Sequence, residues 1–199
     1  MTPANKPSAN EGKLRQLILH ISTLSERDES FGAIKLNKLL FHADFTAYAL
    51  WGKPITGVPY FALENGPAPR PMKKLLGLMA KSGDIAIREN DYFGYPQNRV
   101  IPLKSADTTS FTVDEMNLLF HFIQQYWGVS GTSMSNESHD FLGWAAAELE
   151  EDIPYSVALV GTRKPTKDEI RRGLDLQSMA QECLANNASR KNADHNRGT

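Results

Sequence analysis

Cysteine is nearly absent from the chain, because Cys183 is the only one among 199 residues. A single thiol excludes an internal disulfide and any metal site built from several cysteines. No apolar run approaches the roughly 20 residues that a membrane-spanning helix needs. Residues 1–10 are polar and lack the apolar stretch of a signal peptide. We therefore expect a cytoplasmic protein that does not associate with membranes.

A strong excess of either charge is also missing. The chain has 22 Lys and Arg against 23 Asp and Glu, which gives a formal net charge of −1. Nucleic-acid-binding domains usually carry a clear basic excess, so a nucleic-acid partner is not favoured. Hydrophobic residues make up 41% of the chain and are spread along it. This composition is typical of a folded domain rather than a disordered chain.

Sequence motifs for common enzymes are absent: the chain has no P-loop, no G-x-G-x-x-G, no H-E-x-x-H and no G-x-S-x-G. Ser138-His139-Asp140 contains the three residue types of a catalytic triad, but adjacent helical side chains point in different directions. His42 and Asp44 also point in different directions on the predicted helix. The other histidines lie farther apart in the sequence than zinc ligands usually do. We therefore expect no enzymatic activity, small-molecule substrate, cofactor or metal.

Apolar residues recur at helical spacing in several segments. One of them carries apolar residues on more than one face, including Leu36, Leu39 and Leu40, which predicts a central helix. Capping-box patterns begin two other helices, at Thr112 with Glu115 and at Thr166 with Glu169. The predicted helices span about 14–24, 33–50, 72–79, 112–127, 132–150 with an interruption at 140–143, and 166–184.

Three β-prone runs are predicted to form one short antiparallel sheet: Val58–Leu63, Asp84–Arg88 and Arg99–Leu103. The polar segment between the last two predicts a hairpin loop longer than two residues. The resulting fold class is α+β and mainly α, a helical domain with a small antiparallel β-sheet. We expect a single domain over 11–186, a flexible tail over 1–10 and a disordered tail over 187–199.

Three segments together resemble one known family. The first is K-L-N-K-L-L-F-H-A-D at 35–44, the second is Y-F-A-L-E-N-G-P at 60–67, and the third is Ser138-His139 followed by Leu142-Gly143-Trp144. In order and spacing they resemble the Panacea domain of SocA-like antitoxins, over about 12–158. The chain departs from the pattern in its proline-rich stretch at 68–71 and in Phe41, where tyrosine is commoner. These departures affect the identity of a partner more than the fold.

The resemblance implies a bacterial antitoxin that neutralises a cognate toxin by direct protein–protein contact. Members of the family occur beside many unrelated toxins, and some stand alone or lie in prophages. The sequence does not identify the toxin, the oligomeric state or the mechanism of neutralisation. Blocking of an active site, distortion of the toxin and delivery to a protease are all compatible with the resemblance. An alternative is a winged-helix nucleic-acid binder, because three helices precede a hairpin at 84–103. The small number of cations there, Arg70, Lys73, Lys74 and Lys81 on the third helix and Arg88 and Arg99 on the hairpin, opposes it.

Two groups of residues are candidates for partner binding. Lys35, Lys38 and His42 lie at i, i+3 and i+7 on one stripe of the second helix. The stripe fits a polar rim around an interface, an ordinary solvated face, or lysines paired with acids near the first helix. Residues 64–67 fit either a rigid recognition turn or a structural link, and Trp144 is expected in the core. Our hypothesis assigns partner binding to Lys35, Lys38, His42, Glu64, Asn65, Gly66 and Pro67.

Overall fold

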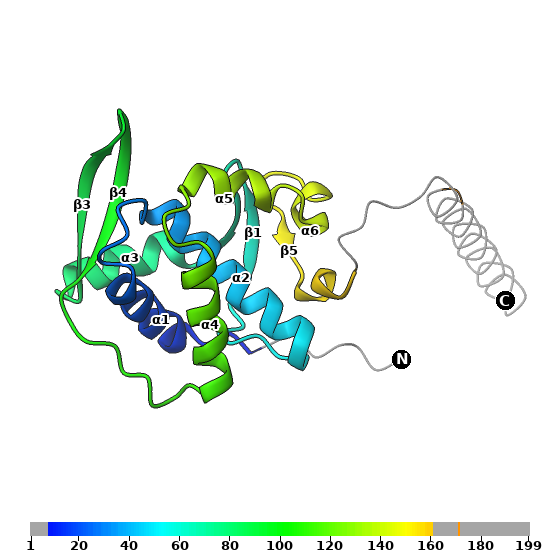
Figure 1. Cartoon of the computed structure of the whole chain (residues 1–199). Coiled ribbons are helices and arrows are strands. Elements are labelled where there is room, and N and C mark those ends of the chain that lie inside the picture. Colours follow the sequence, from blue (N-terminus) through cyan, green and yellow to red (C-terminus); the bar gives the residue numbers. More distant parts are fainter. Residues whose placement is uncertain (1–7, 161–170, 172–199) are drawn as a thin grey trace, which may run out of the picture. The chain divides into compact units, whose positions relative to one another are not determined.

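The computed structural model describes residues 8–160 and residue 171 (Figure 1). Apart from position 171, the predicted last helix over 166–184 lies outside the described residues, as does the predicted tail over 187–199. The same holds for residues 1–7 of the predicted N-terminal tail. The division into one domain over 11–186 and two tails therefore stays a prediction.

Helices dominate the described part of the chain, and the fold class is α+β and mainly α, as predicted. The predicted fifth helix is broken between α5 and α6 at residues 139–141, close to the predicted interruption at 140–143, and it ends at Ala145 rather than at 150. Thr112 begins α4 with the predicted capping box, in which Thr112 and Glu115 each bond the other's backbone N–H. The helices are α1 (Glu11–Leu24), α2 (Ala33–Trp51), α3 (Met72–Lys81), α4 (Val113–Gln125), α5 (Gly131–Ser138) and α6 (Leu142–Ala145), followed by the 3₁₀ helix η1 (Tyr155–Leu159).

The strands form two separate sheets rather than the single sheet predicted. Strand β1 (Tyr60–Leu63) pairs antiparallel with both β2 (Gly66–Pro69) and β5 (Asp152–Ile153), giving the order β2-β1-β5. Strands β3 (Ile85–Tyr92) and β4 (Tyr95–Pro102) pair only with each other among the described residues. The strand β2 was missed because its sequence, G-P-A-P, is rich in turn residues. Proline is tolerated there because β2 lies at the edge of its sheet.

The β3–β4 hairpin is longer than predicted, and its turn is shorter. Tyr92 pairs with Tyr95, so the turn contains only Phe93 and Gly94. Both turn residues have left-handed backbone angles, with φ of 53° and 84°, as a tight hairpin turn requires. The prediction of a longer loop was wrong because turn-type residues, among them Asn90, Asp91 and Pro96, lie within the ladder of a hairpin that projects from the body of the fold (Figure 1). The hydrogen bonds of the ladder join backbone groups, so they do not need apolar side chains.

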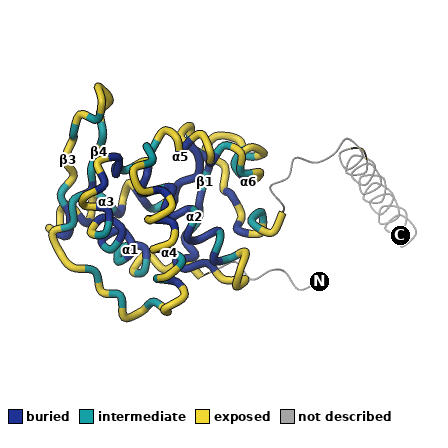
Figure 2. The backbone as a smooth tube through the Cα atoms, viewed as in Figure 1, coloured by how far each residue is buried: buried dark blue, intermediate teal, exposed yellow. Residues whose placement is uncertain are grey.

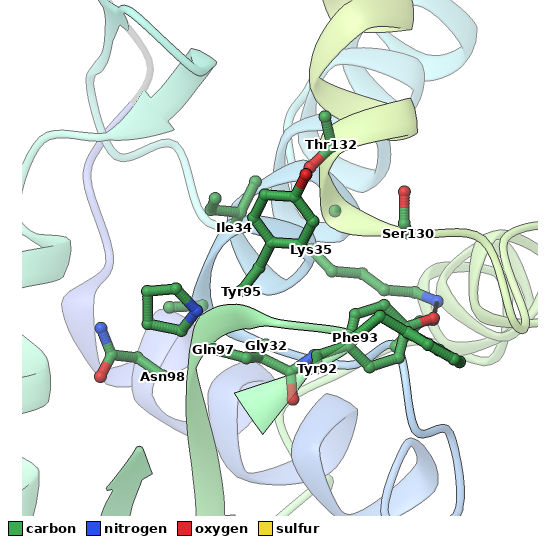
Figure 3. A pocket seen from close by; sticks show the side chains of 14 residues that line it. Gly32, Ile34, Lys35, Tyr92, Phe93, Tyr95, Gln97, Asn98, Ser130 and Thr132 are labelled. Carbon is green, nitrogen blue, oxygen red and sulfur yellow. Dashed lines mark hydrogen bonds between the residues drawn. The ribbon is translucent and has the colours of Figure 1, made fainter. Parts of the chain in front are cut away.

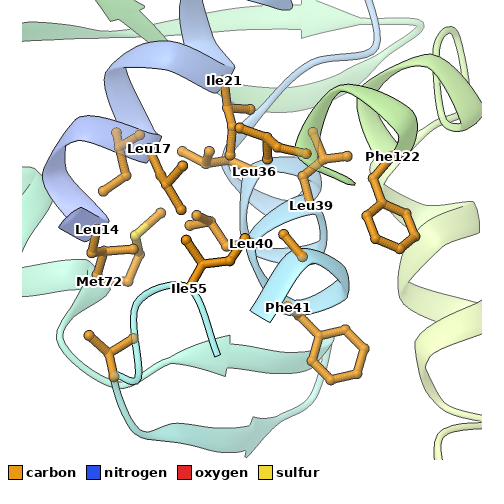
Figure 4. Packing of buried hydrophobic residues seen from close by; sticks show 14 of the residues in the cluster. Leu14, Leu17, Ile21, Leu36, Leu39, Leu40, Phe41, Ile55, Met72 and Phe122 are labelled. Atoms are coloured by element: carbon orange, nitrogen blue, oxygen red, sulfur yellow. The ribbon is translucent and has the colours of Figure 1, made fainter. Parts of the chain in front are cut away.

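Helix α2 lies at the centre of the core, as its apolar faces predicted. Leu36, Leu39 and Leu40 are completely buried against residues from α1, α4 and the segment before β1 (Figure 4). In Figure 2 the buried stretches of the backbone gather around α2. Helices α1, α4 and α5, strand β2 and η1 all contact α2. Within the described ranges, no helix combines the length and the apolar character needed to cross a membrane.

Candidate partner-binding site

Lys35 is buried at the start of α2, where its ammonium group is fully surrounded by acceptors. Its Nζ donates to Asp28 Oδ2 at 2.5 Å and to Ser30 Oγ at 2.8 Å. It also donates to the carbonyl oxygens of Tyr126 at 2.6 Å and Val129 at 2.9 Å. Burial lowers the pKa of Lys35, and the Asp28 carboxylate offsets part of that effect. The lysine therefore joins the α1–α2 loop, α2 and the segment that follows α4.

Lys38, one turn along α2, is also buried but has a poorer environment. Its Nζ donates to the Pro67 carbonyl at 3.0 Å, which is its one hydrogen-bond acceptor among the described residues. Burial with so little compensation lowers the pKa of Lys38 to about 7. The contact ties α2 to strand β2 directly behind the turn at Glu64 and Asn65.

Gly66 begins β2 and lies between side chains of α2 and α5. Its φ of +87° lies in the left-handed region, which a residue with a Cβ rarely adopts. A Cβ at this position would lie 2.1 Å from Ser138 Oγ and 2.6 Å from Lys38 Nζ. Both the backbone angle and the space therefore require glycine, and Gly66 allows α2 and α5 to pack against the hairpin.

Side chains from α5, from α6 and from the segment between them hold the backbone of the β1–β2 turn. Trp144 Nε1 donates to the Leu63 carbonyl at 2.8 Å, and Ser135 Oγ donates to the Asn65 carbonyl at 2.9 Å. His139 Nε2 lies 3.1 Å from the Glu64 carbonyl, which can only accept, so this nitrogen carries the hydrogen. The His139 and Trp144 rings stack with centroids 3.8 Å apart.

Glu64 and Asn65 are exposed, whereas Gly66 and Pro67 are buried behind them. With three consecutive carbonyls bonded and Gly66 fixed from behind, the turn presents its two polar side chains from a well-ordered backbone. Among the seven residues assigned to partner binding, Glu64 and Asn65 are therefore the two whose side chains reach the surface most freely.

The family model for the antitoxin SocA-like Panacea domain matches residues 36–145, more than half of the chain. The chain belongs to this family. No curated protein and no solved structure matches the chain. The matched range begins in α2, contains the β1–β2 hairpin and α5, and ends with α6. All the side chains that hold the β1–β2 turn in this Panacea domain therefore fall inside the match.

The predicted exposed rim of Lys35 and Lys38 is wrong, because each residue is only 1% exposed. The helical spacing was correct, but the stripe faces the α1–α2 loop and β2 rather than solvent. Lys35 instead makes the contact that the alternative anticipated, an ion pair with an acid in the loop after the first helix. In this Panacea domain both lysines position other elements and cannot supply rim charge to a partner.

His42, the third residue of that stripe, packs against α4. Its ring stacks on Phe122 and Tyr126, with centroids 5.3 and 4.9 Å away. Burial, together with the charge of Lys38, lowers the pKa of His42 to about 4. Its Nε2 is buried without a hydrogen-bond partner among the described residues. The neutral ring is thus a part of the core rather than a surface contact.

The serine-histidine pair of the third motif makes separate contacts. Ser138 Oγ donates to the Ser135 carbonyl at 2.7 Å, while His139 Nε2 bonds the β1–β2 turn. Trp144, expected in the core, is partly buried and donates its indole hydrogen to a strand carbonyl. No group of three or more His, Cys, Asp or Glu side chains in the described ranges is arranged to hold a metal ion.

Sequence reasoning missed the role of Asp44, which is completely buried on α2. Its carboxylate accepts from the Thr56 backbone at 2.7 Å, from Thr56 Oγ1 at 2.5 Å and from the Tyr60 hydroxyl at 2.9 Å. Burial raises the pKa of Asp44, and the hydrogen bonds from Thr56 oppose that shift. The sequence offered one indication of this role, because an acidic residue stands within an apolar helix. Asp44 connects α2 to the segment that leads into the β1–β2 hairpin.

Proposed function

We propose that this protein is an antitoxin that neutralises a cognate toxin by direct protein–protein binding. One observation carries the proposal: the Panacea domain of SocA-like antitoxins matches residues 36–145. The arrangement of that range supports it, because the motif residues converge on one exposed turn. Neutralisation by contact needs a surface of this kind and no reaction chemistry.

The β1–β2 turn suits recognition because its backbone is ordered before any partner arrives. Binding loses affinity when a loop must be ordered at the interface, so a fixed turn avoids that loss. Glu64 and Asn65 offer a carboxylate and an amide, which can form hydrogen bonds at the rim of an interface. Lys38, Gly66 and Pro67 act behind them as positioning residues.

The winged-helix alternative gains no support from the positions of its cations. Arg70 is bound to Asp152 in an ion pair at 2.6 Å. Arg99, on the strand that would serve as a wing, donates to the backbone carbonyls of Glu26 and Asp28 at 2.5 and 2.9 Å. These contacts occupy two of the few side chains that a phosphate backbone would need.

The test is co-expression with the product of the adjacent reading frame. If that product arrests growth, this protein should restore growth, and the purified pair should elute as one complex. Replacing the turn side chains in the variant Glu64→Ala/Asn65→Ala should weaken rescue. The matched control Asp114→Ala/Asn117→Ala removes an acid and an amide that are exposed on α4, and rescue should persist. A toxic neighbour that is not rescued, or rescue without any physical complex, would contradict direct neutralisation.

A further inference from the structure

A cleft of about 490 Å³ lies on a different part of the surface from the β1–β2 turn. One wall is the tip of the β3–β4 hairpin, and the other consists of the first turns of α2 and α5. Figure 3 shows the rings of Phe93 and Tyr95 and the side chain of Ile34 around this space. Its volume falls in the range of about 300–1,000 Å³ that is usual for binding pockets.

The cleft carries apolar side chains that the described residues do not cover. Phe93 is 82% exposed, Tyr95 is 74% exposed and Ile34 is 38% exposed. Isolated exposed apolar residues are common, but a group gathered around one depression marks an interaction site. Aromatic residues are also the side chains most enriched at the centres of protein interfaces.

Both walls are held in place before any ligand binds. Gln97 Nε2 donates to the Glu29 carbonyl at 3.2 Å, which fixes β4 beside the α1–α2 loop. Glycines allow the walls to approach, because a Cβ on Gly32 would lie 2.6 Å from Gln97 Cγ. A Cβ on Gly131 would likewise lie 3.2 Å from Ile34 Cβ. The walls of the cleft are thus joined by close packing at these two glycines, and little ordering is needed to fill it.

The electrostatics of the cleft select a neutral occupant. Of the described residues that line it, Lys35 is the only charged one. The ammonium group of Lys35 is occupied by Asp28 and three further acceptors inside the protein. The remaining polar lining consists of amides, hydroxyls and backbone. Phosphate groups would find no free cation here, whereas an apolar side chain would be desolvated against aromatic rings.

We infer that this cleft receives an apolar side chain of the protein partner, inserted between the hairpin tip and the first turn of α2. The inference rests on the proposed antitoxin function and adds a second contact area to the β1–β2 turn. An anchor residue buried in a preformed pocket is the usual centre of a tight protein interface. The polar turn would then belong to the rim of the same or an adjoining interface.

The experiment measures the Kd between this protein and the toxin that it rescues, using variants of both walls. In Phe93→Asn/Tyr95→Ser the hairpin tip loses its rings, and asparagine tolerates the left-handed backbone of position 93. In Ile34→Glu a carboxylate enters the cleft from the first turn of α2, where the helix dipole accommodates it. The control Phe120→Asn/Trp127→Ser removes two aromatic residues, Phe120 on α4 and Trp127 just after it, which are 52% and 43% exposed.

Both cleft variants should weaken binding by about tenfold or more, with the control close to wild type. Thermal melts should stay near the wild-type curve, because the replaced side chains are exposed. Unchanged affinity in both cleft variants, or loss only in the Phe120→Asn/Trp127→Ser control, would overturn the assignment of this cleft. A cleft variant that instead abolishes self-association or retention of nucleic acid would assign another occupant and overturn it too. If the wild-type protein binds no toxin, the proposed function fails first and this inference fails with it.

Discussion

Gly66 offers the sharpest test of how the motif residues pack, through the substitution Gly66→Ala. The left-handed φ of +87° would cost an alanine about 1–2 kcal/mol. The new Cβ would also overlap Ser138 Oγ at 2.1 Å and Lys38 Nζ at 2.6 Å. Overpacking of this kind costs about 1–3 kcal/mol as neighbours shift. The free energy of unfolding should therefore fall by roughly 2–5 kcal/mol.

Gly83→Ala is the matched control, because Gly83 has a φ of +69° but nothing within 4 Å of its Cβ position. That variant should lose only the backbone term of about 1–2 kcal/mol. The difference between the two variants isolates the close approach of the hairpin to α2 and α5. Chemical denaturation gives both values, and each kcal/mol lowers the Tm by roughly 2–4 °C in a protein of this size.

A double variant identifies the neighbour that clashes. Ser138→Ala removes the oxygen that lies closest to the new Cβ, so Gly66→Ala/Ser138→Ala should lose less than the sum of the single losses. Such non-additivity is expected for side chains in direct contact. Equal losses for Gly66→Ala and Gly83→Ala, or strict additivity with Ser138→Ala, would refute the packing argument.

Three further predictions concern the core. Leu40→Ala should lower the free energy of unfolding by about 2–5 kcal/mol because Leu40 is fully buried; an unchanged melt would contradict its place in the core. Lys35→Ala should lose about 3–5 kcal/mol because it leaves the Asp28 carboxylate buried without its cation, whereas the exposed control Lys73→Ala should lose almost nothing. The pKa of His42 is 6.5 in the unfolded chain and about 4 in the folded protein. The stabilisation that depends on its neutral ring should therefore be fully present above pH 6.5 and should decrease on acidification. Between pH 7 and 5 the loss should be about 2 kcal/mol, and His42→Phe should remove it; the same pH slope in that variant would refute the assignment.

The sequence alone determined the features that depend on neighbours a few residues away. Thr112 and Glu115 are three residues apart, so their capping box formed as predicted. The apolar spacing of Leu36, Leu39 and Leu40 likewise located the central helix, because its period matches that of the α-helix. The family resemblance at 35–44, 60–67 and 138–144 was also readable in the chain, and the match over 36–145 confirms it.

Only the tertiary structure decided whether the polar stripe of the central helix faces solvent or the interior of the protein. The acceptors of Lys35 include carbonyls of Tyr126 and Val129, 91 and 94 residues further along the chain. No local pattern reports such a partner, and a lysine stripe on a helix usually faces water. Lys38 likewise bonds a distant carbonyl, that of Pro67. For this reason, lysines that hold the fold together were predicted to form the polar rim of an interface.

The two hairpins were also decided beyond the local sequence. Strand β2 exists because β1 supplies its partner and because Gly66 fits between Lys38 and Ser138, which overrides the turn preference of its prolines. The β3–β4 ladder continues through polar residues because its hydrogen bonds join the backbones of the two strands and do not depend on apolar side chains. The exposed aromatic residues at its tip line a cleft only because α2 and α5 lie opposite them. Such a cleft is formed by segments that are distant in the sequence, so no single segment predicts it.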